Sequence, residues 1–220
     1  MGSITRSFAN NITTSGVLLP ASLNNNSISN VTAYNAAIAT GNMVLISSQT
    51  ASSSASISFT TGIDSTYKEY QFWFVNIHPQ TDDVDFQFNL STDSGSNYNV
   101  TKTSTAFRAY HFENDSGTGL DYLTGNDLAQ STAFQNLGDG DALGADNDQN
   151  ICGVLTLFNP ASTTYVKHFI ATGSESHEID AAINYFIAGY GNTTSAINAI
   201  QFKMSTGNID DGTILMFGIK

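Results

Sequence analysis

Apolar and polar residues alternate along short runs in most of this chain from Met43 onward. Residues 84–90, VDFQFNL, place four apolar side chains on one face and Asp85, Gln87 and Asn89 on the other. The run SASISFT has the same pattern. A period of two is typical of a strand with one face in the core and one face in water. The pattern therefore predicts half-buried β-strands.

Two runs carry apolar residues at nearly every position. Residues 70–77, YQFWFVNI, predict a central strand with both faces covered, which would place Trp73 in the core. Residues 212–219, GTILMFGI, predict a strand in the core sheet, because chain ends usually fray unless a sheet holds them.

About ten such runs are separated by turn-forming segments such as PAST, GSES and GNTTS, and none has the spacing of an amphipathic helix. The segment DSGSN, residues 93–97, predicts a hairpin between the runs on either side of it. Many short strands joined by turns predict an all-β fold, an antiparallel jelly-roll-like β-sandwich. A barrel closed by its last strand is the alternative.

Residues 1–42 differ from the rest, because they are rich in Asn, Ser and Thr and have no sustained apolar period. They predict an extended N-terminal arm in front of a sandwich domain formed by residues 43–220. The arm has one concentrated apolar patch, Val17, Leu18 and Leu19, which either docks on a partner or covers the base of the domain.

Composition narrows the class of partner. The chain has 7 Lys and Arg against 19 Asp and Glu, a net charge of −12. Nucleic acid and anionic lipid both require positive charge, so neither is expected as a partner. The single cysteine, Cys152, excludes an intramolecular disulfide and is expected to be a buried, inert thiol. We find no apolar stretch of membrane-spanning length and no secretory signal.

A polar, acidic insertion occupies about residues 113–150. Oxygen-rich loops bind hard cations, so calcium is a candidate ligand, with Asp139, Asp141, Asp146 and Asp148 as weak candidate residues. The segment does not match an EF-hand loop, and a mobile, solvated loop is the favoured interpretation. No other cofactor is expected.

No catalytic signature is present, so we expect a protein that is not an enzyme. The four histidines form no metal-binding pair, and there is no G-x-S-x-G motif. His111 and Glu113 would share a strand face, a geometry that suits acid–base chemistry, but an ordinary sheet histidine is the favoured interpretation. Glu113, Glu175 and Glu178 form no persuasive pair for glycoside hydrolysis.

Tyrosine and tryptophan side chains can stack on sugar rings. Tyr110 and Tyr122 flank the acidic insertion and are the candidate glycan contacts.

Several segments of the sequence resemble those of a family of tailed-phage virion surface proteins. The segments SISNVT, DSGSNYNVT, FNPASTTYVKHF and the run from NTTSAINAIQFKMS to the C-terminus are similar to a β-sandwich module of tail fibres, head fibres and capsid decoration proteins. The similarity extends along most of the chain.

The resemblance implies a structural protein on the virion surface, made in the cytoplasm of a bacterial host. It implies a homotrimer whose N-terminal segment anchors to other virion proteins of the capsid or tail while the sandwich projects outward. It supplies no catalytic residues. The alternative function is a lectin-like module that recognises a host-surface glycan, either with or without calcium. One fibre can have both functions, assembly on the virion and recognition of a glycan.

Overall fold

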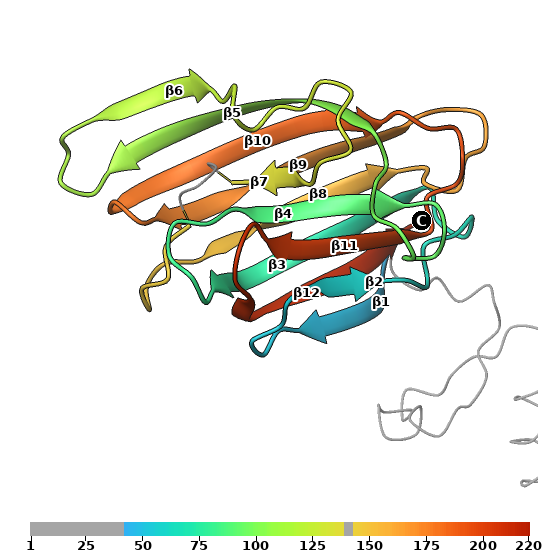
Figure 1. The fold of residues 1–220 in the computed structure, drawn as a ribbon, viewed down its shortest axis with the longest axis horizontal. Coiled ribbons are helices and arrows are strands. Elements are labelled where there is room, and N and C mark those ends of the chain that lie inside the picture. Colours follow the sequence, from blue (N-terminus) through green and yellow to red (C-terminus); the bar gives the residue numbers. More distant parts are fainter. Residues whose placement is uncertain (1–41, 139–142) are drawn as a thin grey trace, which may run out of the picture. The chain divides into compact units, whose positions relative to one another are not determined.

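The computed structural model describes residues 42–138 and 143–220 (Figure 1). This part of the chain contains twelve β-strands and no helix, and so has no helix that could span a membrane. The strands are β1 (Met43–Thr50), β2 (Ile57–Phe59), β3 (Glu69–Pro79), β4 (Phe86–Ser91), β5 (Lys102–Phe112), β6 (Thr118–Tyr122), β7 (Gln135–Leu137), β8 (Ile151–Phe158), β9 (Lys167–His177), β10 (Ala181–Gly191), β11 (Ala199–Met204) and β12 (Ile209–Ile219).

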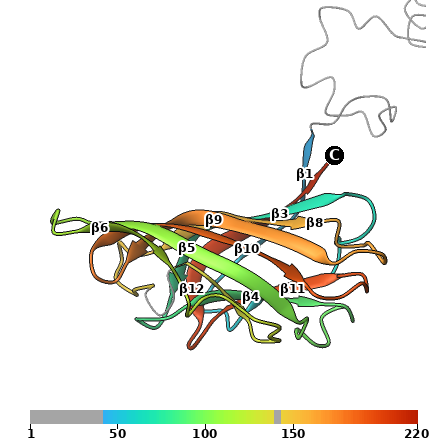
Figure 2. The ribbon, with the colours of Figure 1, turned by 90° about the horizontal axis from the view of Figure 1, so that it is seen from above.

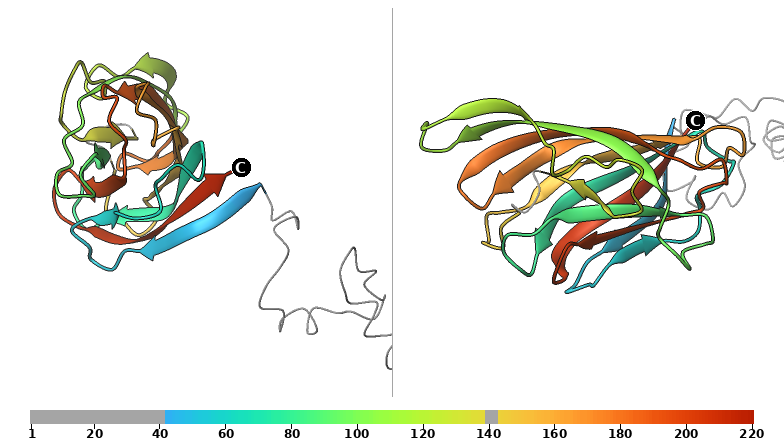
Figure 3. Two further views of the ribbon diagram at one scale, coloured as in Figure 1. Left: turned by 90° about the vertical axis from the view of Figure 1, so that its right-hand side faces the viewer. Right: turned by 45° about the horizontal axis from the view of Figure 1, so that its top comes forward.

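The strands form two antiparallel sheets that face each other (Figure 3). The larger sheet has the order β1-β12-β3-β8-β9-β10-β5-β6, and the smaller has the order β2-β11-β4-β7. Successive connections cross from one sheet to the other, except those that join β5 to β6, β8 to β9 and β9 to β10. Each sheet has two open edges, which makes the domain a sandwich and not a closed barrel. The predicted all-β antiparallel sandwich is confirmed.

The core lies between the sheets and is rich in phenylalanine. Phe202 on β11 is fully buried, and its ring lies 5.3 Å from that of Phe74 and 5.6 Å from that of Phe72, both on β3 in the opposite sheet. Alternation places these rings inward and their sequence neighbours outward. The final apolar run belongs to β12, which pairs with β1 and β3, so the predicted core strand at the C-terminus is confirmed.

Two glycines make room for a large side chain in the larger sheet. Gly153 on β8 and Gly173 on β9 are cross-strand partners, and a Cβ at either would lie about 2 Å from the Tyr185 hydroxyl. The Tyr185 ring is fully buried, and burial raises the pKa of its hydroxyl. The absence of side chains at both positions lets β10 place this phenol across its neighbours.

The predicted hairpin around residues 93–97 is wrong. The chain does turn there, but β4 pairs with β11 and β7 in the smaller sheet, whereas β5 pairs with β10 and β6 in the larger one. Only one backbone hydrogen bond joins the two runs among the described residues, from the Val100 N–H to the Leu90 carbonyl at 3.4 Å. Both strands bury more surface by joining opposite sheets than they would as an isolated pair.

The acidic insertion contributes β6 to the edge of the larger sheet and β7 to the edge of the smaller one. Seen from above, β5 and β6 extend the larger sheet at one end of the domain (Figure 2). Within the insertion, Asn126 and Gln135 are buried. The described part of the insertion is therefore built into the fold. The predicted arm, with Val17, Leu18 and Leu19, falls on residues 1–41, which lie outside the described residues.

Candidate functional site

The outward side of the larger sheet carries an apolar row that crosses seven adjacent strands. Cross-strand register aligns Leu215 on β12, Trp73 on β3, Val154 on β8, Thr172 on β9, Phe186 on β10, Phe107 on β5 and Tyr122 on β6. We call this outward side the outer face and these residues the apolar row. Every member except Thr172 is apolar or aromatic.

The outer face is open to solvent in the described chain. Trp73 is 37 % exposed, Phe107 is 41 % exposed and Leu45 is 53 % exposed. The rings pack against one another along the sheet: Trp73 lies 5.4 Å from Phe217, and Phe107 stacks on Phe186 at 5.1 Å. The prediction that both faces of β3 are covered, with Trp73 in the core, is wrong for this chain. The smaller sheet lies against only one face of the larger one.

Charge is almost absent from the outer face. Over the regular parts of its eight strands, before the bulged ends of β3 and β12, Glu69 is the only Asp, Glu, Lys or Arg among the outward positions. The chain as a whole has a net charge of −12. The acidic residues therefore gather elsewhere, in loops and strand ends.

Several polar side chains of the outer face already have hydrogen-bond partners within the chain. The Trp73 indole N–H donates to Gln71 Oε1 at 3.0 Å, and Gln71 Nε2 donates to Glu69 Oε1 at 2.8 Å. Asn184 Nδ2 donates to the Gly173 carbonyl at 3.0 Å. These groups would keep a partner if the face were covered, so burying them carries little desolvation cost.

A shallow hollow of about 470 Å³ lies in the outer face beside the apolar row. Its outward lining includes Phe158, Ile170, Ala188 and Tyr190 from three adjacent strands, with Thr105 at one side. The small side chain of Ala188 lowers the surface between larger side chains. The hollow is mostly apolar and suits a side chain better than a charged ligand.

A second group of polar residues is buried on the inward side of the larger sheet. Glu175 is 3 % exposed, and His177 follows it on the same face of β9. Burial raises the pKa of Glu175 to about 7, with a further contribution from the Asp85 charge, whereas His177 and Arg108 act in the opposite direction. Burial lowers the pKa of His177.

Sequence reasoning missed the burial of Glu175. It treated the segment GSES as a turn, but residues 173–176 lie inside β9. Gly173 and the two serines gave a turn-like composition, and only the alternation of Gly173, Glu175 and His177 on one face could have indicated a strand.

The raised pKa of Glu175 predicts how stability depends on pH. An unfolded chain releases this proton near pH 4.5 and the folded chain only near pH 7, so the group costs stability as pH rises between these values. Glu175→Gln should remove that cost and, relative to wild type, gain up to roughly 3 kcal/mol between pH 5 and pH 8. Urea unfolding of both proteins at the two pH values measures the difference. An equal offset at both pH values would contradict it.

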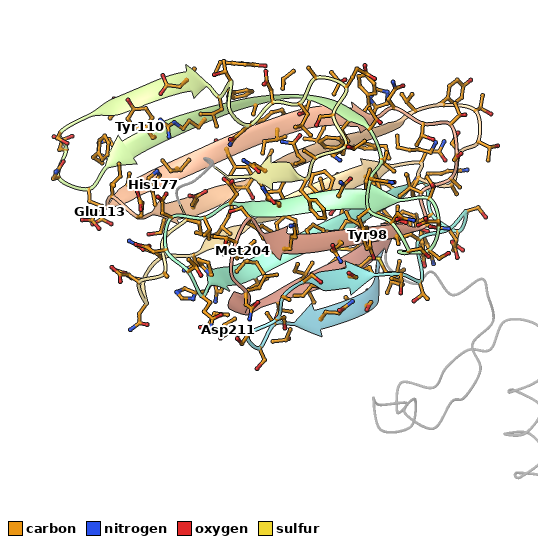
Figure 4. All side chains as sticks on the ribbon, viewed as in Figure 1. Tyr98, Tyr110, Glu113, His177, Met204 and Asp211 are labelled. Carbon is orange, nitrogen blue, oxygen red and sulfur yellow. The ribbon has the colours of Figure 1, made fainter. Side chains whose placement is uncertain are left out.

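The two tyrosines predicted to bind a glycan lie on opposite faces of the β5–β6 hairpin. Tyr110 faces inward, where Arg108 lies 4.9 Å from its ring centroid, and it lines a small cleft of about 100 Å³ with His177 (Figure 4). Tyr122 belongs to the apolar row, is 54 % exposed and donates to Asp127 Oδ2 at 2.7 Å. The structure therefore does not bring Tyr110 and Tyr122 together on one platform.

Among the calcium candidates, Asp139 and Asp141 lie outside the described residues. Asp146 and Asp148 are exposed, and the Asp146 carbonyl accepts from the Gln149 N–H at 2.9 Å. Residues 42–138 and 143–220 contain no group of three or more His, Cys, Asp or Glu side chains that could hold a metal ion. The calcium site stays a prediction.

The remaining sequence candidates lie apart from one another. His111 is exposed at the end of β5, and its Nε2 lies 3.2 Å from Asp115 Oδ1; it is not paired with Glu113. Cys152 is only partly buried on the outer face of β8, where the Asn76 N–H donates to its sulfur at 3.2 Å. The expected burial of this thiol is therefore incomplete, because nothing in the described chain covers that face.

The apolar row and the hollow beside it form the most extensive candidate interaction surface among the described residues. Comparison of the chain with protein-family models, with curated proteins and with solved structures gave no match.

Proposed function

We propose that this chain is a non-enzymatic structural protein of a tailed-phage particle, a capsid decoration protein, a head fibre or a short tail fibre. In this proposal it is made in the cytoplasm of a bacterial host and assembles on the virion surface. Residues 1–42 anchor it to capsid or tail proteins, and the sandwich projects outward as a homotrimer.

The connectivity of the sandwich supports a jelly-roll fold for this role. The order β1-β12-β3-β8 in the larger sheet and the order β2-β11-β4-β7 in the smaller sheet form two sets of four strands, and the chain crosses between the two sets along most of its length. Double-sheet jelly rolls are common among viral capsid proteins. In this interpretation β5–β6 and β9–β10 are two hairpins added to one sheet.

The observation that carries the proposal is the outer face itself. An exposed apolar surface of this extent marks an interaction site on a soluble domain. A catalytic pocket instead concentrates polar and titratable groups around a concave site. The apolar row offers a broad, nearly uncharged surface, which suits assembly better than chemistry.

The proposal predicts that the chain occurs in purified virions in a fixed copy number. Quantitative mass spectrometry of purified particles should detect it at copy numbers that match capsid symmetry for a decoration protein, or at only a few per particle for a fibre. Its absence from virions of the phage that encodes it would contradict the proposal.

A further inference from the structure

We propose that a second copy of this chain covers the outer face of the larger sheet, centred on the apolar row. This inference deepens the proposed assembly role and rests on it, because it assigns the surface through which copies would meet.

The residue pattern of β3 is that of a strand covered on both sides. Tyr70, Phe72 and Phe74 point into the core and are at most 2 % exposed, whereas Trp73 and Val75 point outward and are 37 % and 41 % exposed. Strands that face water on one side usually carry polar residues there. The outward apolar side chains of β3 are therefore explained if another surface covers them.

Several polar groups of the outer face also form hydrogen bonds with one another. The Trp73 indole N–H and the Gln71 amide bond within the face, and the hydroxyls of Thr50 and Thr213 lie 2.9 Å apart. A covering surface would not have to supply partners for these groups, which removes the usual penalty for burying polar atoms.

Charge favours a second copy as the occupant. Two chains of net charge −12 repel each other wherever acidic residues would face acidic residues. Over the regular parts of its strands the outer face has one acidic residue, Glu69, near its margin, and Asp127 accepts from the Tyr122 hydroxyl at one end of the apolar row. It is therefore the surface on which two copies can meet with least repulsion. A foreign partner selected by charge would find almost no charged group to recognise there.

The size and the shape of the outer face suit contact with a second copy of the chain. A standard interface uses about 20 to 30 residues on each side, and the outer face spans eight strands. Its exposed rings, such as Phe107, lie on the same face as the apolar hollow that Ile170 lines. In a homotrimer each contact joins one part of the face to a different part of the same face on the next copy, so a ring of one copy can meet the hollow of its neighbour.

The test is sedimentation equilibrium of the full chain and of charge variants over a range of concentrations. Wild type should form a species larger than a monomer. Ile170→Glu places a charge at the centre of the face on a side chain that is 37 % exposed, and it should weaken association about 100-fold or more. Phe107→Glu, elsewhere on the face, should do the same.

The matched control is Ile179→Glu. Ile179 is 52 % exposed in the turn between β9 and β10, away from the outer face, so the same substitution there should leave association unchanged. Far-ultraviolet circular dichroism of each variant checks that the domain is folded, and the second face variant keeps the test decisive if the first does not fold.

The outcomes separate this inference from the function on which it rests. If wild type associates and both folded face variants associate equally well, the outer face is not the interface, and the assembly role stands. If wild type stays monomeric at its highest soluble concentration, the inference is overturned together with the proposed trimer. If Ile179→Glu also dissociates the protein, an added negative charge weakens association wherever it lies, and the inference fails.

Discussion

Asn89→Leu should lower the free energy of unfolding by about 3 to 5 kcal/mol, because the buried Lys102 amine and two backbone carbonyls each lose a hydrogen-bond partner, at about 1 to 3 kcal/mol for each buried group. Lys102 is fully buried, and its Nζ donates to Asn89 Oδ1 at 2.5 Å and to the Val100 carbonyl at 3.0 Å. Asn89, also fully buried, donates from Nδ2 to the carbonyls of Tyr98 and Thr132. Leucine satisfies none of these groups.

The loss should be largest at low pH. Burial lowers the pKa of Lys102 to about 7, so the folded chain prefers the neutral amine, and the lysine costs stability below that pH. The cost is relieved as pH rises from about 7 towards 10.5, where the unfolded chain also releases the proton. Urea unfolding at pH 6 and pH 9 should therefore show a smaller effect of Asn89→Leu at pH 9.

The double variant Asn89→Leu, Lys102→Met is the control for this pair. Replacing both partners by apolar side chains removes the buried amine, so the double variant should recover part of the stability that the single variant loses. Recovery should be incomplete, because the carbonyls of Tyr98 and Thr132 still lack their donor. Additive losses in the two single variants would show that Asn89 and Lys102 do not interact.

Phe202→Ala should cost about 3 to 5 kcal/mol, the usual range for removing a fully buried aromatic ring. The Phe202 ring is 0 % exposed and lies among five other rings, from both sheets, with centroids 5.3 to 6.4 Å away: Phe59, Phe72, Phe74, Phe86 and Phe88. These neighbours belong to strands held by backbone hydrogen bonds, so the cavity cannot collapse fully. Guanidinium unfolding at one fixed protein concentration measures the loss.

Tyr165→Ala is the matched control for this substitution. Tyr165 is 71 % exposed, and its hydrogen bonds are made by its backbone: the N–H donates to Ser162 Oγ at 3.1 Å and the carbonyl accepts from Lys167 Nζ at 2.7 Å. Removing its ring should change the free energy of unfolding by no more than about 0.5 kcal/mol. Similar losses for Phe202→Ala and Tyr165→Ala would show that the aromatic cluster does not hold the sheets together.

The apolar row shows how a correct pattern led to a wrong location. YQFWFVNI does form a central strand of the larger sheet, as its composition predicts, but the described residues cover only one of its faces. The local sequence shows how apolar each face of a strand is, but it does not show what covers that face. The outer side of β3 is apolar, yet the described residues leave it uncovered, and this mismatch is the basis for inferring that a second copy covers it.

The sequence by itself determined the fold class and several of the strands. Alternation in VDFQFNL and the apolar run at the C-terminus predict β4 and β12, because a strand turns successive side chains to opposite faces whatever its neighbours are. The absence of helical spacing likewise predicted an all-β fold, which the described residues confirm.

Only the tertiary structure decided which strands pair and which polar residues are buried. Asn89 has the polar position of an alternating strand, yet segments from residues 98 and 132 cover it and Lys102 reaches it from the other sheet. Tyr110 and Tyr122 are close in sequence and lie on opposite faces, because the register of β5 and β6 separates them. Pairing and burial depend on contacts between residues far apart in the chain, which no local pattern encodes.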